Sequence, residues 1–223
     1  MAIRRTPFLI GEHYHIYNRG VDKRIIFIDE HDYKRFSALL YLCNNTNPVD
    51  IRTLFNEGLP FVEFFSVDRG GQIVDIGAYC LMPNHFHILI KERVEKGISV
   101  FMEKLSTAYS MYFNKKHDRS GRLSEGPFKA KHIDNGAYFN WLFSYIHLNP
   151  IKIIDPMWKE SGISDSEKAR KFVELYKHSS YFDYFSGDRP EGVILNKKAF
   201  PEYFVHLGNF EGLIKEFSKP HKG

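Results

Sequence analysis

The stretch LMPNHFHILIKE, Leu81–Glu92, places two histidines one residue apart at the start of an apolar run, directly after a Pro-Asn turn. A run of branched apolar residues bounded by a turn is typical of a buried strand. In a strand, residues i and i+2 project from the same face, so His85 and His87 stand side by side while Phe86 points to the opposite face. Two neutral imidazoles on one rigid face are half of a metal site. A bare H-x-H also occurs as two surface or hydrogen-bonded histidines on an edge strand.

A second H-x-H, His13 and His15 in GEHYHIYNRG, has the same spacing on another predicted strand, residues 13–19. The pair His85 and His87 has the stronger setting, because the Pro-Asn turn fixes where its strand begins and ILI continues it as a buried run. Spacing alone does not rank the two pairs.

Composition and cysteine usage indicate a globular protein of a reducing compartment. The chain has 223 residues, of which 43% are hydrophobic and 16% aromatic, enough for one sizeable core or a core with an extension. The two cysteines, Cys43 and Cys80, form no C-x-x-C pair, which argues against a disulfide framework or a zinc knuckle. No apolar run is long enough for a signal peptide or a membrane span. We expect a cytoplasmic protein with no membrane partner.

Positive charge is concentrated in the first two thirds of the chain. The net charge is +4, a mild basic excess that permits a nucleic-acid partner without requiring one. Residues 160–223 contain as many acidic as basic residues, so residues 1–159 carry the whole excess. The sequence therefore predicts that a polyanion meets the N-terminal part rather than the tail.

Apolar spacing in the first half of the chain predicts a mixed pattern of strands and helices. A helix beginning at Asp29 follows the strand 13–19. Phe61–Val67, a DRGGQ turn and a strand from Ile73 are expected to form a hairpin, and the His85 strand comes next.

The second half begins with a helix that Ser99 is expected to cap and that extends to about His117. A basic, turn-rich segment, RSGRLSEGPFKAKHID, separates it from a helix running from about Asn135 to Pro150, where the proline ends it. These elements predict an α+β fold, most simply a ferredoxin-like antiparallel sheet with helices packed on one face. Residues 1–155 form this domain, and residues 156–223 form a C-terminal extension of unknown role.

The helix before Pro150, NGAYFNWLFSYIHLNPIK, carries further candidates. Tyr145 and Asn149 are four residues apart and therefore share a helix face. The Asn149 carboxamide lies in the last turn, where its oxygen can reach an ion beyond the helix end. Taken alone, an aromatic residue at helical spacing is most often part of a core, and an asparagine before proline is most often a cap.

Several motifs in one order make the sequence resemble a known family. MPNHFHILI, a helix ending in YFNKK, then GPFKAKHI and YIHLNPIK resemble the single-tyrosine HUH transposases, in particular the REP-associated tyrosine transposases, and YHIYNRG near the N-terminus fits as well. The resemblance covers roughly residues 10–155. It favours His85 and His87 over the other histidine pair.

The resemblance implies a metal-dependent single-strand endonuclease and strand transferase. His85 and His87 would be metal ligands, Tyr145 the nucleophile that forms a covalent phosphotyrosine link, and Asn149 the remaining ligand. Several relatives have glutamine or another residue at that last position. The ion would be Mg²⁺ or Mn²⁺, and the substrate single-stranded or hairpin DNA. Relatives include monomers and domain-exchanged dimers, so a homodimer is one possible assembly.

Basic residues in two segments are the expected DNA contacts, because lysine and arginine follow phosphates while exposed aromatic rings stack on unpaired bases. Any one of them can equally be an ordinary solvated side chain. The candidates are Arg19, Lys23, Arg24, Lys115, Lys116, Arg119, Arg122, Lys129 and Lys131.

Two other functions share parts of this pattern. A rolling-circle-type replication initiator or relaxase would use the same histidines and tyrosine, but a chain of 223 residues without a nucleotide-binding motif has little room for the usual additional regions. A non-cleaving nucleic-acid-binding module would keep the fold and lose a catalytic group. His85, His87 and Tyr145 are all present, which favours the transposase.

Overall fold

A four-stranded antiparallel sheet forms the centre of the molecule, in a computed structural model that describes residues 7–202, 204 and 209–219. The strand order is β2-β3-β1-β4, so β1 and β3 are the two inner strands. Both H-x-H pairs therefore lie on inner strands, which neighbours flank on each side. The ends of the two predicted units, 1–6 and 220–223, lie outside the described residues. The strands are β1 (His13–Arg19), β2 (Val74–Met82), β3 (His85–Glu92) and β4 (Lys129–His132).

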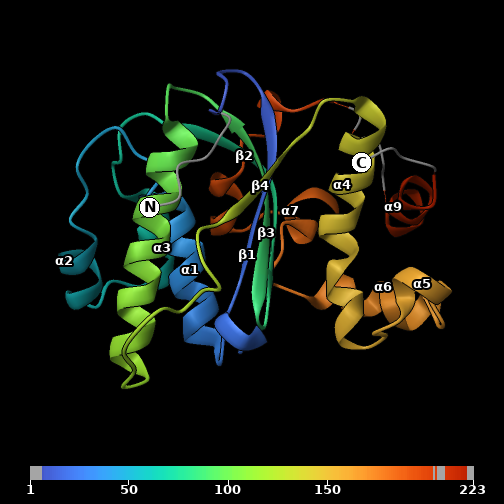
Figure 1. The fold of residues 1–223 in the computed structure, drawn as a ribbon, viewed down its shortest axis with the longest axis horizontal. Coiled ribbons are helices and arrows are strands. Elements are labelled where there is room, and N and C mark those ends of the chain that lie inside the picture. Colours follow the sequence, from blue (N-terminus) through green and yellow to red (C-terminus); the bar gives the residue numbers. More distant parts are fainter. Residues whose placement is uncertain (1–6, 203, 205–208, 220–223) are drawn as a thin grey trace.

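Helices cover both faces of the sheet, which confirms the α+β class but corrects the expectation that they pack on one face. Figure 1 shows the sheet nearly edge-on, with α1 and α3 on one side and α4 with α5, α6 and α9 on the other. The first face buries Ile16, Ile88 and Phe101 in one apolar cluster, and the second buries Leu89, Leu142 and others in a separate cluster. The helices of the predicted domain are α1 (Glu30–Leu42), α2 (Ile51–Asn56), α3 (Gly97–Lys116) and α4 (Gly136–Leu148), with the 3-10 helices η1 (Val21–Lys23), η2 (Phe61–Ser66) and η3 (Asn149–Ile153).

The extension 156–223 is also helical and packs on the second face together with α4. Among the residues that the structure describes, no helix is long and apolar enough to cross a membrane. The elements of the extension are α5 (Trp158–Ser161), α6 (Ser166–Leu175), α7 (Tyr181–Phe185), η4 (Pro190–Ile194), η5 (Lys197–Ala199) and α9 (Phe210–Phe217).

The extension also occupies the outer edge of β2. Ser180 donates its backbone N–H to the Tyr79 carbonyl at 2.9 Å, and Leu81 donates to the His178 carbonyl at 2.9 Å. Arg189 locks this segment, because its guanidinium binds both carboxylate oxygens of Asp183, at 2.9 and 2.7 Å. Such bidentate pairing is among the strongest charged contacts in proteins. The extension is thus an integral part of the folded unit.

Several boundaries differ from the sequence prediction for reasons of tertiary contact. Phe61–Val67 is not a strand: most of it is the 3-10 helix η2, whose Phe64 and Phe65 are buried. Helix α3 begins at Gly97 instead of at a Ser99 cap, because the buried Glu92 carboxylate accepts the Ile98 backbone N–H at 2.7 Å. A carboxylate is favoured at a helix N-terminus, where backbone N–H groups lack partners. The cap therefore comes from the end of β3.

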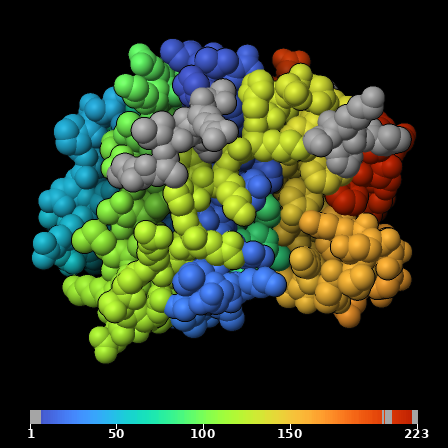
Figure 2. Space-filling view, viewed as in Figure 1, coloured from blue at the N-terminus to red at the C-terminus, as the bar shows by residue number. Residues whose placement is uncertain are grey.

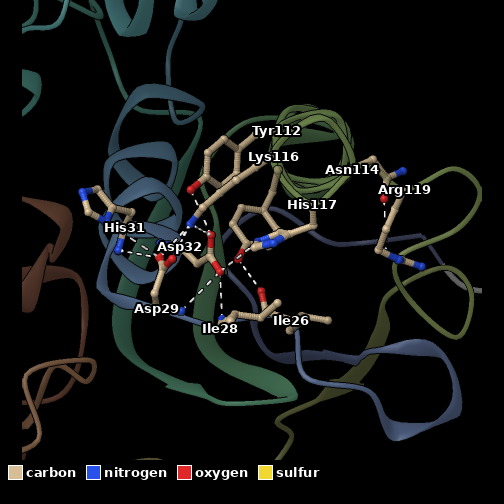
Figure 3. A network of polar contacts seen from close by, with 11 residues as sticks. Ile26, Ile28, Asp29, His31, Asp32, Tyr112, Asn114, Lys116, His117 and Arg119 are labelled. Carbon is tan, nitrogen blue, oxygen red and sulfur yellow. Dashed lines mark hydrogen bonds and ion pairs between the residues drawn. The ribbon is translucent and has the colours of Figure 1, made fainter.

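A buried carboxylate joins α1 to the end of α3. Asp29, where the helix was expected to begin, is its N-cap and forms a reciprocal capping box with Asp32, whose side chain is fully buried. Figure 3 shows Lys116 between these two carboxylates, at 2.7 Å from Asp29 and 2.8 Å from Asp32. Tyr112 donates its hydroxyl to Asp32 at 2.9 Å. Burial alone would raise the pKa of Asp32, but the bonds from Lys116, the Ile28 backbone and Tyr112 outweigh burial and lower it.

We expect Asp32→Asn to lower the free energy of unfolding at pH 7 by about 2 kcal/mol, a typical value for hydrogen bonds to a charged group. Since the folded pKa of Asp32 is lowered, its contribution is present above the unfolded carboxyl pKa of about 3.9 and is lost as pH falls through the folded value. Urea denaturation at pH 7 and pH 2.5 measures this. The difference in the free energy of unfolding between Asp32→Asn and the wild type should be smaller at pH 2.5 than at pH 7. Equal stability of the two proteins at pH 7 would contradict the assignment.

Candidate active site

The two histidines of β3 lie on the face that α4 covers. His85 and His87 alternate with the buried Phe86 and Ile88, which point into the opposite core. The rings of His85 and His87 lie 5.0 Å apart between centres. The same-face arrangement predicted from the sequence is thus present. The strand β3 that carries it pairs with a neighbouring strand on each side.

A turn residue fixes the orientation of the first imidazole. Pro83 and Asn84 form the two-residue connection between β2 and β3. His85 Nδ1 lies 2.6 Å from Asn84 Oδ1. An amide oxygen can only accept, so the ring donates from Nδ1 and keeps the lone pair of Nε2. His85 is thereby prepared to bind through Nε2.

His15, from the other H-x-H, supports the second imidazole. Its Nε2 lies 2.8 Å from Nδ1 of His87, and both rings are buried. When His87 donates this hydrogen bond, its own Nε2 keeps a lone pair that points toward α4. A hydrogen bond at the far ring nitrogen is the usual way in which proteins orient a metal-binding histidine.

Tyr145 reaches the same point from α4. Its hydroxyl oxygen lies 3.4 Å from His87 Nε2. The ring stacks on Trp141, with 5.0 Å between ring centres and an angle of 5°. Burial raises the pKa of Tyr145 to about 12, and Asn149 acts in the opposite direction. The phenol therefore keeps its proton at neutral pH in the protein alone.

Asn149 is buried beside these groups without a hydrogen bond. It is 1% exposed, and within the described part of the chain neither its amide oxygen nor its amide nitrogen has a partner. It is close enough to shift the pKa values of both His85 and Tyr145. The α-helix ends at Leu148, shortly before the expected end at Pro150, and Asn149 starts η3. An unpaired amide in a buried place is costly, and it is typical of a position that a water or another polar group completes.

The donor set fits a divalent cation. Within the described ranges, no three His, Cys, Asp or Glu side chains form a group that could hold a metal ion. Two imidazoles and one amide oxygen do come together at His85, His87 and Asn149. Burial lowers the pKa of His85 to about 4 and the pKa of His87 well below its ordinary value, so both rings are neutral at pH 7. Metal binding requires neutral imidazoles.

His13 and two further tyrosines, Tyr109 and Tyr112, lie away from this point. His13 packs its ring against Phe139 and Phe200, 4.8 and 5.3 Å away between ring centres. Tyr109 and Tyr112 are on the opposite side of the sheet, where Tyr109 donates to the Ile26 carbonyl. None of these residues reaches the His87 ring in the way that Tyr145 does.

A cleft of 710 Å³ opens at His85, His87 and Tyr145. Figure 2 shows a hollow in which parts of the blue and green segments lie deeper than the yellow-green segment around β4 and the orange extension. Three of the predicted DNA contacts line the cleft, namely Arg19, Lys23 and Lys129. Lys131 lies two residues further along β4, opposite His15, and therefore on the same face of the sheet.

The other predicted contacts do not line this cleft. Arg24 pairs with Asp22 at 3.8 Å, and Lys116 is held by Asp29 and Asp32. Arg119 bonds with Asn114 at 3.3 Å at the end of α3, away from the carboxylates in Figure 3. Lys115 and Arg122 are exposed near the same helix end.

Sequence reasoning missed three residues at the site. Tyr17 lies with its ring centre 5.9 Å from that of His87, and Lys152 lines the cleft. Lys159, in the extension, lies with its ammonium 4.0 Å from the centre of the Tyr145 ring. Tyr17 is two residues after His15, and Lys152 is three after Asn149, so strand and turn spacing offered a signal for both. Lys159 had none, because only the folding of the extension brings it close.

Parts of this chain are similar to known proteins. A solved structure described as "Structure of the REP associates tyrosine transposase bound to a REP hairpin" is 13% identical, covers 84% of this chain and 93% of its own, and has a TM-score of 0.49. No curated protein matches the sequence. The family described as "Transposase IS200 like" matches residues 69–148, which extend from before β2 to the end of α4. Residues 69–148 are therefore similar to this transposase family.

Proposed function

We propose that the protein cuts and rejoins single-stranded or hairpin DNA through a covalent link to Tyr145. The observation that carries this proposal is the approach of the Tyr145 hydroxyl to His87 Nε2, at 3.4 Å, beside the buried and unpaired Asn149. The match to the transposase family supports a DNA-processing enzyme.

His85, His87 and Asn149 would hold the divalent ion through two imidazole nitrogens and one amide oxygen. When bound, Mg²⁺ or Mn²⁺ acts as a Lewis acid on a phosphate oxygen. The mixed nitrogen and oxygen donors suit Mn²⁺ somewhat better, while cellular abundance favours Mg²⁺. Asn84 and His15 serve this site by fixing the tautomers of the two imidazoles.

Tyr145 supplies the nucleophile. The phenol loses its proton, its oxygen forms a bond to phosphorus, and the bond from phosphorus to the leaving sugar oxygen breaks while that oxygen takes up a proton. The stacked Trp141 fixes the ring plane. The phosphotyrosine link retains the bond energy, so rejoining needs no ATP, and the sequence contains no G-x-x-x-x-G-K motif.

The cleft supplies the remaining binding energy for DNA. Arg19, Lys23 and Lys129 line it with positive charge, and Tyr17 offers an aromatic ring to an unpaired base. Arg19 is also ion-paired with Glu125 at 2.8 Å, which holds it at the rim.

A single chain brings together all the groups that this chemistry requires. The histidines of β3 and Tyr145 of α4 meet within one copy of the protein. We therefore propose that cleavage occurs in cis and that a homodimer, if it forms, is not needed to complete the site.

Divalent-ion binding should depend on His85 and His87 and, less strongly, on His15. We expect His85→Ala and His87→Ala to abolish Mn²⁺ binding, because each removes a ligand. His15→Ala should weaken Mn²⁺ binding by about 10-fold to 100-fold, as loss of an orienting hydrogen bond does. Titration calorimetry measures each affinity, with His13→Ala as the matched control. Loss of binding in His13→Ala but not in His85→Ala would show that the wrong pair was chosen.

Tyr145→Phe should bind Mn²⁺ and DNA but form no covalent adduct. Phenylalanine keeps the ring that packs on Trp141 and removes only the attacking oxygen. A denaturing gel of the protein, Mn²⁺ and a pool of labelled single-stranded hairpins detects the adduct. Tyr17→Phe and Tyr138→Phe are controls that should retain the band. An adduct that persists in Tyr145→Phe and disappears in a control would transfer the role to that tyrosine.

Neutralising Lys129 and Lys131 together should weaken DNA binding and reduce its salt dependence. Each phosphate contact releases counterions, so two lost contacts lower the slope of log affinity against log salt by about 2. Fluorescence anisotropy with a labelled hairpin at several salt concentrations measures the slope. Lys115→Met with Arg122→Met is a charge-matched control outside the cleft. If the salt dependence of binding equals that of the wild type, β4 is not part of the DNA interface.

A further inference from the structure

Aromatic stacking brings the C-terminal extension to the candidate site. Trp158 of α5 is 2% exposed and packs on Phe217 of α9, 4.7 Å away between ring centres. Phe217 stacks on Trp141 at 5.6 Å, and Trp141 stacks on Tyr145 at 5.0 Å. The extension and the helix of the proposed nucleophile thus share one row of four rings. Burying Trp158 fixes the position of its neighbour Lys159.

Lys159 has no carboxylate partner next to Tyr145. Its ammonium lies 4.0 Å from the centre of the Tyr145 ring, and none of the ion pairs among the described residues includes it. Burial, and then the charge of Lys152, lower the pKa of Lys159 to about 8, and the opposing effect of the neighbouring Glu160 is smaller. A cation under these conditions gains strongly from a nearby anion.

The surroundings of Lys159 favour an anion over any other ligand. Lys152 lines the cleft together with Arg19, Lys23 and Lys129, and the Lys159 ammonium lies at the ring of Tyr145, which lines the same cleft. Among the described residues that line the adjacent cleft, Glu125 is the one acidic residue, and Arg19 already neutralises it. The site therefore has an excess of positive charge that its own side chains do not balance.

We propose that Lys159 of the extension binds a non-bridging oxygen of the phosphodiester that Tyr145 attacks, with Lys152 beside it. The inference rests on the proposed function and adds a residue to it. The lysine side chain is flexible, so its ammonium can move from the ring to a phosphate positioned at the phenol oxygen. It neutralises charge on the phosphate and on the phenolate together. The extension then has a direct part in DNA cleavage.

A binding cycle with a neutral phosphate tests the contact. The Tyr145→Phe protein, which cannot react, is combined with Lys159→Met, and binding is measured to the labelled hairpin that gives the strongest adduct in the gel assay. A second hairpin carries a methylphosphonate at the cleaved position, which removes the negative charge. We expect Lys159→Met to lower affinity about 10-fold for the phosphodiester, equivalent to about 1.4 kcal/mol, and less than about 2-fold for the methylphosphonate. Equal losses with both hairpins would overturn the proposal.

Two controls separate a direct contact from a change in structure. Lys171→Met removes one charge from α6 of the same extension, where Lys171 pairs with Glu167 at 2.7 Å on the surface, and it should lower affinity equally little for both hairpins. Mn²⁺ affinity of Lys159→Met should equal that of the parent protein. A Lys159→Met protein that no longer binds Mn²⁺ would show that Lys159 maintains the site instead of binding phosphate.

The result is independent of the test of the proposed function. If the protein with Tyr145 intact forms an adduct and Lys159→Met forms it at the same rate, Lys159 is not involved while the proposed function stands. If no adduct forms with Tyr145 intact, the proposed function itself is wrong. A slower rate in Lys159→Met, largely restored in Lys159→Arg, is the result that we expect.

Discussion

The exclusion of water from one face of the sheet is the condition on which the candidate site depends. His15, His85 and His87 are neutral because burial opposes their protonation. An exposed imidazole with an ordinary pKa near 6.5 would be partly charged in the cell and would repel a cation. The helix α4 provides this cover and also carries Tyr145. The packing of α4 on the sheet therefore creates the neutral imidazoles of the proposed metal site and also positions the proposed nucleophile.

The same burial opposes the chemistry that we propose for Tyr145. A buried phenol with a pKa of about 12 is a poor nucleophile, and each unit by which its pKa is raised corresponds to about 1.4 kcal/mol. Positive charge is needed to offset this cost. The ion, Asn149 and Lys159 would all act on the phenol oxygen or the phosphate. Such a site stays unreactive until the ion and the DNA have bound.

The parts of the fold that depend on local sequence could be predicted. The strand 13–19, the helix beginning after Asp29 and the same-face histidines are encoded by residues close together in the chain. The short strand β4 was missed, because its four residues become a strand only by pairing with β1. The cap of α3 was assigned to Ser99, since nothing local shows that the Glu92 carboxylate turns back onto the helix.

For the candidate site too, the sequence could indicate only what residues close together in the chain encode. His85, His87, Tyr145 and Asn149 were proposed from strand period, helix period and the order of motifs, and they lie close together in the structure. The charge count placed Lys159 within the basic residues 1–159 but did not single it out. Net charge averages over a segment, whereas a contact depends on the single side chain that folding brings to the site. Lys159 is the side chain for which we propose such a contact.

The row of stacked rings has a practical consequence for studying this protein. The chain contains two tryptophans, Trp141 and Trp158, and both belong to the row that begins at Tyr145. Tryptophan dominates the intrinsic fluorescence of proteins, so nearly all of this protein's emission originates beside the proposed nucleophile. A base or a phosphate that enters the cleft changes the surroundings of these indoles. The unlabelled protein thus contains its own optical reporter of events at the tyrosine.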